Sequence, residues 1–307
     1  MILSKWWKVR KDVSCPEPPP FPAEVPASGI SGNPLFLVFT DLDGTLLDHD
    51  TYGWEKARDA LDRCRERHVP VILVSSKTRA EMEPLRRRMG LAAPFVSENG
   101  GGIFFPEEIV PGPRAPGSDG LWEWPLGEPY SRLVRALRGI REDLGWPIRG
   151  FSDMDIREIS ERTGLDTEHA RLAAMREFDE PFVILKPGAP DREMLARAAA
   201  ERGLTVTEGG RFFHLKGRND KGLAMEKIVS WYRRSHPRVI SVALGDGPND
   251  LPMLKRADHP VFVRSGKGAS SPGERVPGLR VAAETGPEGW NSAVLDILFR
   301  KEETDHA

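Results

Sequence analysis

Residues 35–45 read LFLVFTDLDGT, an apolar run that ends in two aspartates and a glycine. The Leu, Val and Phe residues predict a buried β-strand, and the polar residues after them predict a tight loop at its carboxyl end. Only one residue separates Asp41 from Asp43. If both side chains point into one small volume, their repulsion destabilises the loop unless a cation is present. The stretch therefore predicts a site for a magnesium-like ion at the end of a strand.

The composition narrows the class of protein. A length of 307 residues predicts one large or two moderate domains. The net charge of −2, from 44 basic and 46 acidic residues, gives no general attraction for nucleic acid or an anionic membrane. Two distant cysteines favour a reducing compartment, and no apolar stretch has the roughly 20 residues that span a bilayer. The first residues also lack the apolar core of a secretory signal. We therefore expect a cytoplasmic protein with a small-molecule partner, no nucleic acid and no membrane.

Strand-like and helix-like stretches alternate in two parts of the chain. Apolar runs at 35–40, 69–74 and 95–97 are separated by amphipathic stretches, which predicts a parallel α/β sheet. The same rhythm returns after residue 221, with strands at 239–244 and 260–263 and a helix near 290–299. We therefore expect a Rossmann-like parallel core made of residues 34–108 and 216–300.

The segment between these parts has a different pattern. Residues 106–129 are rich in Pro and Gly, and helices are predicted at 131–144, after Asp166 and at 192–201. A strand at 182–186 and a hairpin of 204–208 with 211–216 complete the segment. This mixture predicts an inserted α+β domain over 109–215. The Pro-rich residues 1–33 are expected to be an extended or disordered tail, and 301–307 a solvated end.

Polar residues follow four of the predicted strands. In an open parallel sheet the carboxyl ends of the strands meet at one edge, where ligands bind. An isolated Asp-x-Asp-Gly is also found in calcium loops and ordinary turns, but its joint occurrence with a later acidic loop favours a catalytic site. The residues concerned are Asp41 and Asp43, Ser75, Glu98 and Asn99, and Asp246, Asn249 and Asp250.

Four parts of the sequence resemble, in order and spacing, the four motifs of the haloacid dehalogenase-like phosphohydrolases. They are DLDGT at 41–45, Ser75, Lys221 and GDGPND at 245–250. The inserted segment resembles the type-two cap of that superfamily. Within that superfamily, the sequence resembles the mannosyl-3-phosphoglycerate phosphatases in four further stretches. These are SSKTR at 75–79, ENGGG at 98–102, GGRFFH at 209–214 and DKG at 220–222.

The resemblance implies a role for each motif residue. Asp41 would be the nucleophile that forms an aspartyl-phosphate, and Asp43 the general acid and base. Ser75 and Lys221 would hold the phosphoryl oxygens. A Mg²⁺ ion would be bound by Asp41, the backbone carbonyl of Asp43 and Asp246, with Asp250 as a ligand through water or as support for the other ligands. The predicted substrate-binding residues are Ser76, Lys77, Glu98, Asn99, Gly100, Arg211 and Asn249.

Several alternatives stay open at this point. Related sugar phosphatases act on glucosyl-3-phosphoglycerate, sucrose phosphate or hexose phosphates, and a phosphomutase or a non-catalytic binding protein on the same fold are further alternatives. Arg211 and His214 are three residues apart on one strand, so they face opposite sides. We expect Arg211 to bind an anion and His214 to be a partly buried strand residue. Trp122 and Trp124 are expected in the core of the cap rather than in a sugar-stacking platform.

Overall fold

The computed structural model describes residues 18–19, 34–107, 109–110, 120–185, 191–209, 211–266 and 275–299. Apart from 18–19, the predicted tails 1–33 and 301–307 lie outside these ranges, as do Lys186 of a predicted strand and Gly210 of the predicted hairpin turn. The carbonyl of Pro19 accepts a hydrogen bond of 3.1 Å from the indole of Trp231.

The central sheet has five parallel strands in the order β12-β11-β10-β1-β2. Four of them confirm predicted strands, while the fifth, β12, was missed because its largely exposed sequence RVAAET lacks an apolar run. The strands are β1 (Leu35–Thr40), β2 (Val71–Leu73), β10 (Val239–Gly245), β11 (His259–Arg264) and β12 (Arg280–Thr285). The predicted parallel α/β fold is therefore confirmed.

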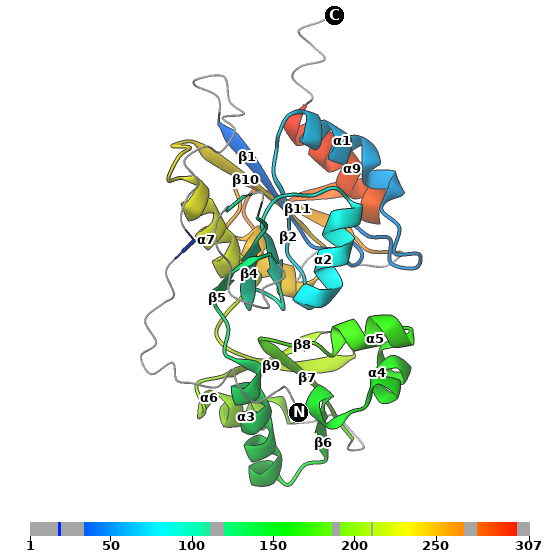
Figure 1. Cartoon of the computed structure of the whole chain (residues 1–307), viewed down its shortest axis with the longest axis vertical. Helices are drawn as coiled ribbons and strands as arrows, with labels where there is room; N and C mark the ends of the chain where they lie inside the picture. The colour runs from blue at the N-terminus through cyan, green and yellow to red at the C-terminus, as the bar shows by residue number, and fades with distance from the viewer. Residues whose placement is uncertain are drawn as a thin grey trace, which may run out of the picture.

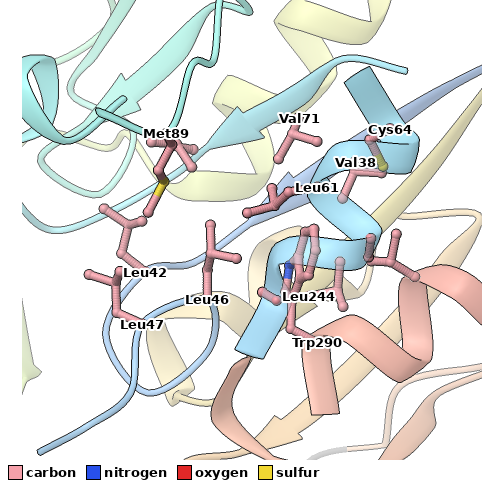
Figure 2. Packing of buried hydrophobic residues seen from close by; sticks show 14 of the residues in the cluster. Val38, Leu42, Leu46, Leu47, Leu61, Cys64, Val71, Met89, Leu244 and Trp290 are labelled. Atoms are coloured by element: carbon pink, nitrogen blue, oxygen red, sulfur yellow. The ribbon is translucent and has the colours of Figure 1, made fainter. Parts of the chain in front are cut away.

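Helices cover both faces of this sheet (Figure 1). Because side chains alternate along a strand, Val38 packs with α1 (Arg58–Glu66) and α9 (Gly286–Leu298). Leu37 and Phe39 pack on the other face with α7 (Lys221–Tyr232) and α8 (Leu251–Leu254). Figure 2 shows the first cluster, in which the Trp290 ring lies among apolar side chains of β1, α1 and β10. Two buried clusters thus fix β1 from both sides.

A second sheet continues from the edge of the first. Val74 forms a parallel bridge with Val96 of β3 (Phe95–Ser97), which pairs in antiparallel fashion with β4 (Gly102–Phe105). β4 in turn pairs with β5 (Trp122–Pro125). The ring of Trp124 lies tilted beside that of Phe105, with 6.5 Å between ring centroids, in the buried cluster that also contains residues of α7. The expectation that Trp122 and Trp124 belong to the cap core is therefore wrong, because β5 pairs with a strand of the catalytic core.

The described residues within 130–216 contain the third sheet and four helices, and we call this part of the chain the cap unit. Its antiparallel strands run in the order β6-β7-β9-β8. They are β6 (Ile148–Gly150), β7 (Asp179–Ile184), β8 (Thr205–Gly209) and β9 (Phe212–Lys216). The helices are α3 (Tyr130–Leu144), α4 (Ile156–Thr163), α5 (Thr167–Ala173) and α6 (Arg192–Ala200). The predicted boundary between core and cap at residue 109 stays a proposal. Strand β5, which follows that position, pairs with β4 of the second sheet.

The cap unit lies beside the carboxyl-end loops of the central sheet (Figure 1). Helix α2 (Arg79–Arg88) begins at this boundary, where the hydroxyl of its N-cap Thr78 donates to the carbonyl of Leu172, at 2.9 Å. The short 3₁₀ helices are η1 (Glu55–Ala57), η2 (Phe151–Asp153) and η3 (Pro248–Asp250). Among the described residues, no helix has the length and apolar character needed to cross a membrane.

Candidate active site

Asp41 is held at the end of β1 by the neighbouring strand. Its backbone N–H donates to the carbonyl of Leu244 on β10, at 2.9 Å. The loop then turns at Gly44, which has a φ of +79°. A Cβ there would lie 2.8 Å from a carboxylate oxygen of Asp246, so only glycine lets the two acidic loops approach so closely.

Lys221 lies between two carboxylates. Asp220 caps α7 by accepting from the N–H of Leu223, at 2.7 Å, which makes Lys221 the first residue of the helix. Its Nζ donates to Oδ1 of Asp41 at 2.5 Å and to Oδ1 of Asp250 at 2.6 Å. The lysine is fully buried. Burial alone would lower its pKa, but the two carboxylates outweigh that effect and raise the pKa, so the ammonium stays charged.

The acidic loop after β10 completes a cluster suited to a divalent cation. Carboxylate oxygens of Asp41, Asp246 and Asp250 all lie within 4.8 Å of one another. Oδ2 of Asp250 accepts from the N–H groups of Asp246, at 3.0 Å, and Gly247, at 2.9 Å. Both oxygens of Asp250 are thus engaged, whereas Asp41 keeps one oxygen that Lys221 does not hold. The oxygen donor set fits a hard divalent cation, and Asp250 also holds Lys221 and the backbone of residues 246–247 in place.

Burial makes this carboxylate cluster electrostatically unfavourable without a cation. Burial is the main cause that raises the pKa of Asp41, and Asp250, Asp246 and Asp43 raise it further, while Lys221 opposes the shift. Burial, followed by the charge of Asp250, likewise raises the pKa of Asp246. A bound divalent cation would favour the ionised forms of both groups.

The second motif brings Lys77 to Asp43. Nζ of Lys77 lies 2.9 Å from Oδ2 of Asp43. Burial acts to lower the pKa of Lys77, but the charges of Asp43 and Glu81 and the hydrogen bond to Asp43 together outweigh it and raise the pKa. The hydroxyl of Ser75 accepts from the backbone N–H of Lys77, at 3.2 Å, and the carbonyl of Ser76 accepts from Arg176 of the cap unit, at 2.9 Å. This loop therefore lies between Asp43 and the cap unit.

Glu98 contacts the cap unit through its carboxylate. Its side chain is fully buried, and its two oxygens accept from the backbone N–H groups of Glu177 and Phe178, each at 2.9 Å. Burial raises the pKa of Glu98 to about 8, against the opposing charge of Arg176. Both carboxylate oxygens of Glu98 thus already accept hydrogen bonds from the backbone of the cap unit. The predicted contact of Glu98 with substrate stays a prediction.

Asn99 and Gly100 connect the same loop to two other motifs. Oδ1 of Asn99 accepts from the side-chain amide of Asn249, at 3.2 Å, and Gly100 has a φ of +91°. A Cβ at position 100 would lie 2.2 Å from the carbonyl oxygen of Asp220, the residue before Lys221. The loop 98–100 thus supports the start of α7.

Arg211 lies away from this set of contacts. One nitrogen of its guanidinium donates to the carbonyls of Arg162 and Thr163 at the end of α4, at 3.2 and 3.1 Å. Its predicted anion-binding role stays a prediction. Sequence reasoning did not identify Arg176 and Asp179, which lie 3.8 Å apart beside the Ser76 loop. Neither lies in a recognised motif, and the partner of Asp179, His214, is 35 residues away, so the sequence carried no signal for this pair.

Comparisons with known proteins agree with this geometry. The family model described as haloacid dehalogenase-like hydrolase matches residues 38–110 and 194–269, the two parts that carry the acidic loops. A protein of Methanococcoides burtonii named glucosyl-3-phosphoglycerate/mannosyl-3-phosphoglycerate phosphatase is 40% identical over 266 residues, covering 85% of this chain and 97% of the relative. The chain belongs to the haloacid dehalogenase-like hydrolases. A relative of the same name from Persephonella marina is 35% identical over the same share of each chain.

Solved structures of other proteins share the fold of this haloacid dehalogenase-like hydrolase. A Thermoplasma acidophilum protein aligns with a TM-score of 0.61 and 21% identity, over 85% of this chain and 97% of its own. A haloacid dehalogenase-like hydrolase from Bacteroides thetaiotaomicron aligns with a TM-score of 0.59 and 18% identity, over 85% and 99%. The predicted family, fold class and assignment as a phosphatase are confirmed.

Proposed function

We propose that this hydrolase removes phosphate from glycosyl-3-phosphoglycerates, with the mannosyl and glucosyl compounds as its substrates. The observation that carries the proposal is the buried Lys221 beside Asp41, next to Asp246 and Asp250. The two relatives are named for both substrates and align with nearly their whole length, cap unit included, which supports extending the substrate class to this chain. The products would be the glycosylglycerate and inorganic phosphate.

In the first half-reaction Asp41 attacks the phosphorus of the monoester with the carboxylate oxygen that Lys221 does not hold. The bond from phosphorus to the glycerate oxygen breaks, and the protonated carboxyl of Asp43 donates its proton to that oxygen. Ser75 and Lys221 hold the phosphoryl oxygens, on which negative charge must be stabilised. The product of this step is the glycosylglycerate, with an aspartyl-phosphate at position 41.

In the second half-reaction water hydrolyses the aspartyl-phosphate. Asp43, now ionised, takes a proton from the water as it attacks phosphorus, which releases phosphate and restores both carboxyl groups. Lys77, 2.9 Å from Asp43, supplies a positive charge beside the ionised form. The proton that leaves Asp43 in the first step is thus replaced in the second.

We also propose Mg²⁺ as the resident cation. Asp41 and Asp246 would hold it, together with the backbone carbonyl of Asp43, and Asp250 would orient them or bind through water. Oxygen donors alone are the ligands that Mg²⁺ prefers. When bound, it would reduce the repulsion between the anionic nucleophile and the phosphate.

The substrate class is tested by phosphate release from a panel of esters. The panel contains mannosyl- and glucosyl-3-phosphoglycerate, sucrose phosphate, a hexose phosphate and p-nitrophenyl phosphate, with Asp41→Asn as the inactive control. We expect the two glycosyl-3-phosphoglycerates to have the highest kcat/KM. A higher kcat/KM for a hexose phosphate or sucrose phosphate would overturn the proposed substrate, and full activity of Asp41→Asn would overturn the mechanism.

A further inference from the structure

The cap sheet has two unlike faces. On one face, Phe182, Phe213 and Leu215 pack against α3 and α6 in a buried apolar cluster. Because side chains alternate along each strand, the opposite face carries Asp179 on β7 and both His214 and Lys216 on β9. Asp179 pairs with Lys216 in register, and Thr207 of β8 lies opposite His214. A row of polar and charged side chains therefore lies on the face that α3 and α6 leave uncovered.

This polar face begins at the catalytic loops. Arg176, which lies 3.8 Å from Asp179, donates to the carbonyl of Ser76 in the second motif. At the other strand, Nζ of Lys216 donates to the carbonyl of Asn219, at 2.7 Å, two residues before Lys221. Figure 1 shows β7, β8 and β9 on the side of the cap unit that is turned toward the core. A molecule whose phosphate lies at Asp41 would therefore extend toward this face.

Asp179 is a buried carboxylate with one oxygen unused. Its side chain is fully buried, and Oδ2 lies 2.7 Å from Nδ1 of His214. Burial acts to raise its pKa, but His214, Arg176 and Lys216 lower it, so Asp179 is ionised at neutral pH. Oδ1 is buried and has no hydrogen-bond partner among the described residues. A buried carboxylate with an unpartnered oxygen costs free energy, so its contacts with His214 and Arg176 matter for holding it in place.

The carboxylate also orients the ring of His214. An ionised carboxylate only accepts hydrogen bonds, so Nδ1 donates to Asp179 and Nε2 is the ring nitrogen left for a ligand. Within the described part of the chain, no hydrogen bond reaches Nε2. A Cβ at Gly209 would lie 3.3 Å from Nε2, so the glycine keeps that nitrogen uncovered. A hydroxyl group both donates and accepts, so it can form a hydrogen bond with this nitrogen.

We propose that His214, oriented by Asp179, forms a hydrogen bond with a hydroxyl of the substrate's glycosyl ring and thereby selects glycosylated phosphate esters. The inference rests on the proposed function, because it takes the glycosyl part of that substrate as the ligand. His214 is therefore a specificity-determining residue of the cap unit.

The test compares kcat/KM for mannosyl-3-phosphoglycerate with kcat/KM for p-nitrophenyl phosphate, which has no sugar. In His214→Ala the ratio of these two values should fall at least tenfold, mainly through a higher KM for the glycosylated ester. Asp179→Asn should lower the same ratio, because the ring then loses the buried charged acceptor that orients it. His214→Gln, which offers an amide oxygen, should recover part of the loss. His169→Ala is the matched control, since His169 forms the same 2.7 Å contact with Asp166 on the exposed surface of α5.

The outcomes separate the two proposals. An unchanged ratio in His214→Ala, or an equal loss on both esters with no recovery in His214→Gln, would overturn the role of His214. Should His214→Ala fail to fold, Asp179→Asn and His214→Gln carry the same comparison. Wild-type protein that hydrolyses p-nitrophenyl phosphate but neither glycosyl-3-phosphoglycerate would instead overturn the proposed function.

Discussion

Nζ of Lys221 lies 2.5 Å from Oδ1 of Asp41, although the two residues are 180 positions apart in the chain. Lys221 begins α7 and Asp41 follows β1, so the contact joins the two parts of the catalytic core. Asp250 contacts the same ammonium at 2.6 Å. Because these groups are shielded from water, each charge depends on the others for its stabilisation. One lysine thus holds Asp41 in place and offsets part of the negative charge of the carboxylate cluster.

Replacing this lysine should damage activity and stability together. In Lys221→Met, two buried carboxylates lose their cationic partner, so we expect the free energy of unfolding to fall by about 3–5 kcal/mol. Loss of a group that stabilises the phosphoryl oxygens should lower kcat by roughly 10²–10³-fold. Urea unfolding and steady-state kinetics measure the two effects. The control Lys56→Met removes an exposed ion pair with Glu288 and should cost less than about 1 kcal/mol. Wild-type kcat in Lys221→Met would contradict the assigned role.

Metal removal should abolish turnover reversibly. Treatment with EDTA should eliminate hydrolysis of p-nitrophenyl phosphate, and excess Mg²⁺ should restore it, because Asp41, Asp246 and Asp250 need a counter-charge. Mg²⁺ should also raise the Tm of the folded protein, with about 2.7 kcal/mol of stabilisation at a hundredfold excess over Kd. Asp246→Asn should lose this rise in Tm, whereas Asp62→Asn, in an exposed pair with Arg65, should keep it. Full activity after complete metal removal would rule out the cation.

Much of the core could be predicted because its signals are local. The apolar run 35–40 fixes β1, and the residues that follow it must lie at the carboxyl edge of the sheet. The same logic located Asp246 and Asp250 after β10, and the structure brings them to Asp41. Strand β12 and helix α4 were missed, since β12 is largely exposed and α4 buries only Ile159. Elements with so few buried positions show no clear apolar periodicity that would distinguish them from a loop.

The cap side of the site could not be predicted because its contacts are not local. Glu98 has the sequence context of a substrate-binding loop, yet its carboxylate accepts from backbone groups about 80 residues away. Arg211 and His214 were ranked by side-chain chemistry alone. The structure gives Arg211 two carbonyl partners at the end of α4 and gives His214 a buried carboxylate. Tertiary packing decides which side chains keep hydrogen-bond donors or acceptors available for a ligand.

Glu98 should make stability depend on pH. Its pKa of about 8 in the folded protein exceeds the ordinary value of 4.5, so between these values only the folded protein holds the proton. The free energy of unfolding should therefore fall as pH rises through this window, by up to about 1.4 kcal/mol per unit. Glu98→Gln removes the titration, so its Tm should fall less steeply than that of the wild type between pH 5.5 and 8. Thermal unfolding across this range measures both slopes.

A matched variant on the surface isolates this effect. Glu161→Gln removes a carboxylate from an exposed pair with Arg157 and should leave the wild-type slope unchanged. Equal slopes for the wild type and Glu98→Gln would show that Glu98 is ionised throughout the window. In that case the hydrogen bonds from the two backbone N–H groups and the charge of Arg176 would stabilise the ionised carboxylate more than burial destabilises it.

A comparison of two glycines separates backbone strain from close packing. Gly100 and Gly145 both have positive φ, +91° and +60°. A Cβ at Gly145 has no heavy atom within 4 Å, so Gly145→Ala should cost only about 1 kcal/mol for its conformation. At Gly100 the Cβ would lie 2.2 Å from the carbonyl oxygen of Asp220, which must then move and shift Lys221 with it. Gly100→Ala should therefore lower both Tm and kcat, while Gly145→Ala keeps its kcat; equal effects of the two variants would contradict a role for loop 98–100 in positioning α7.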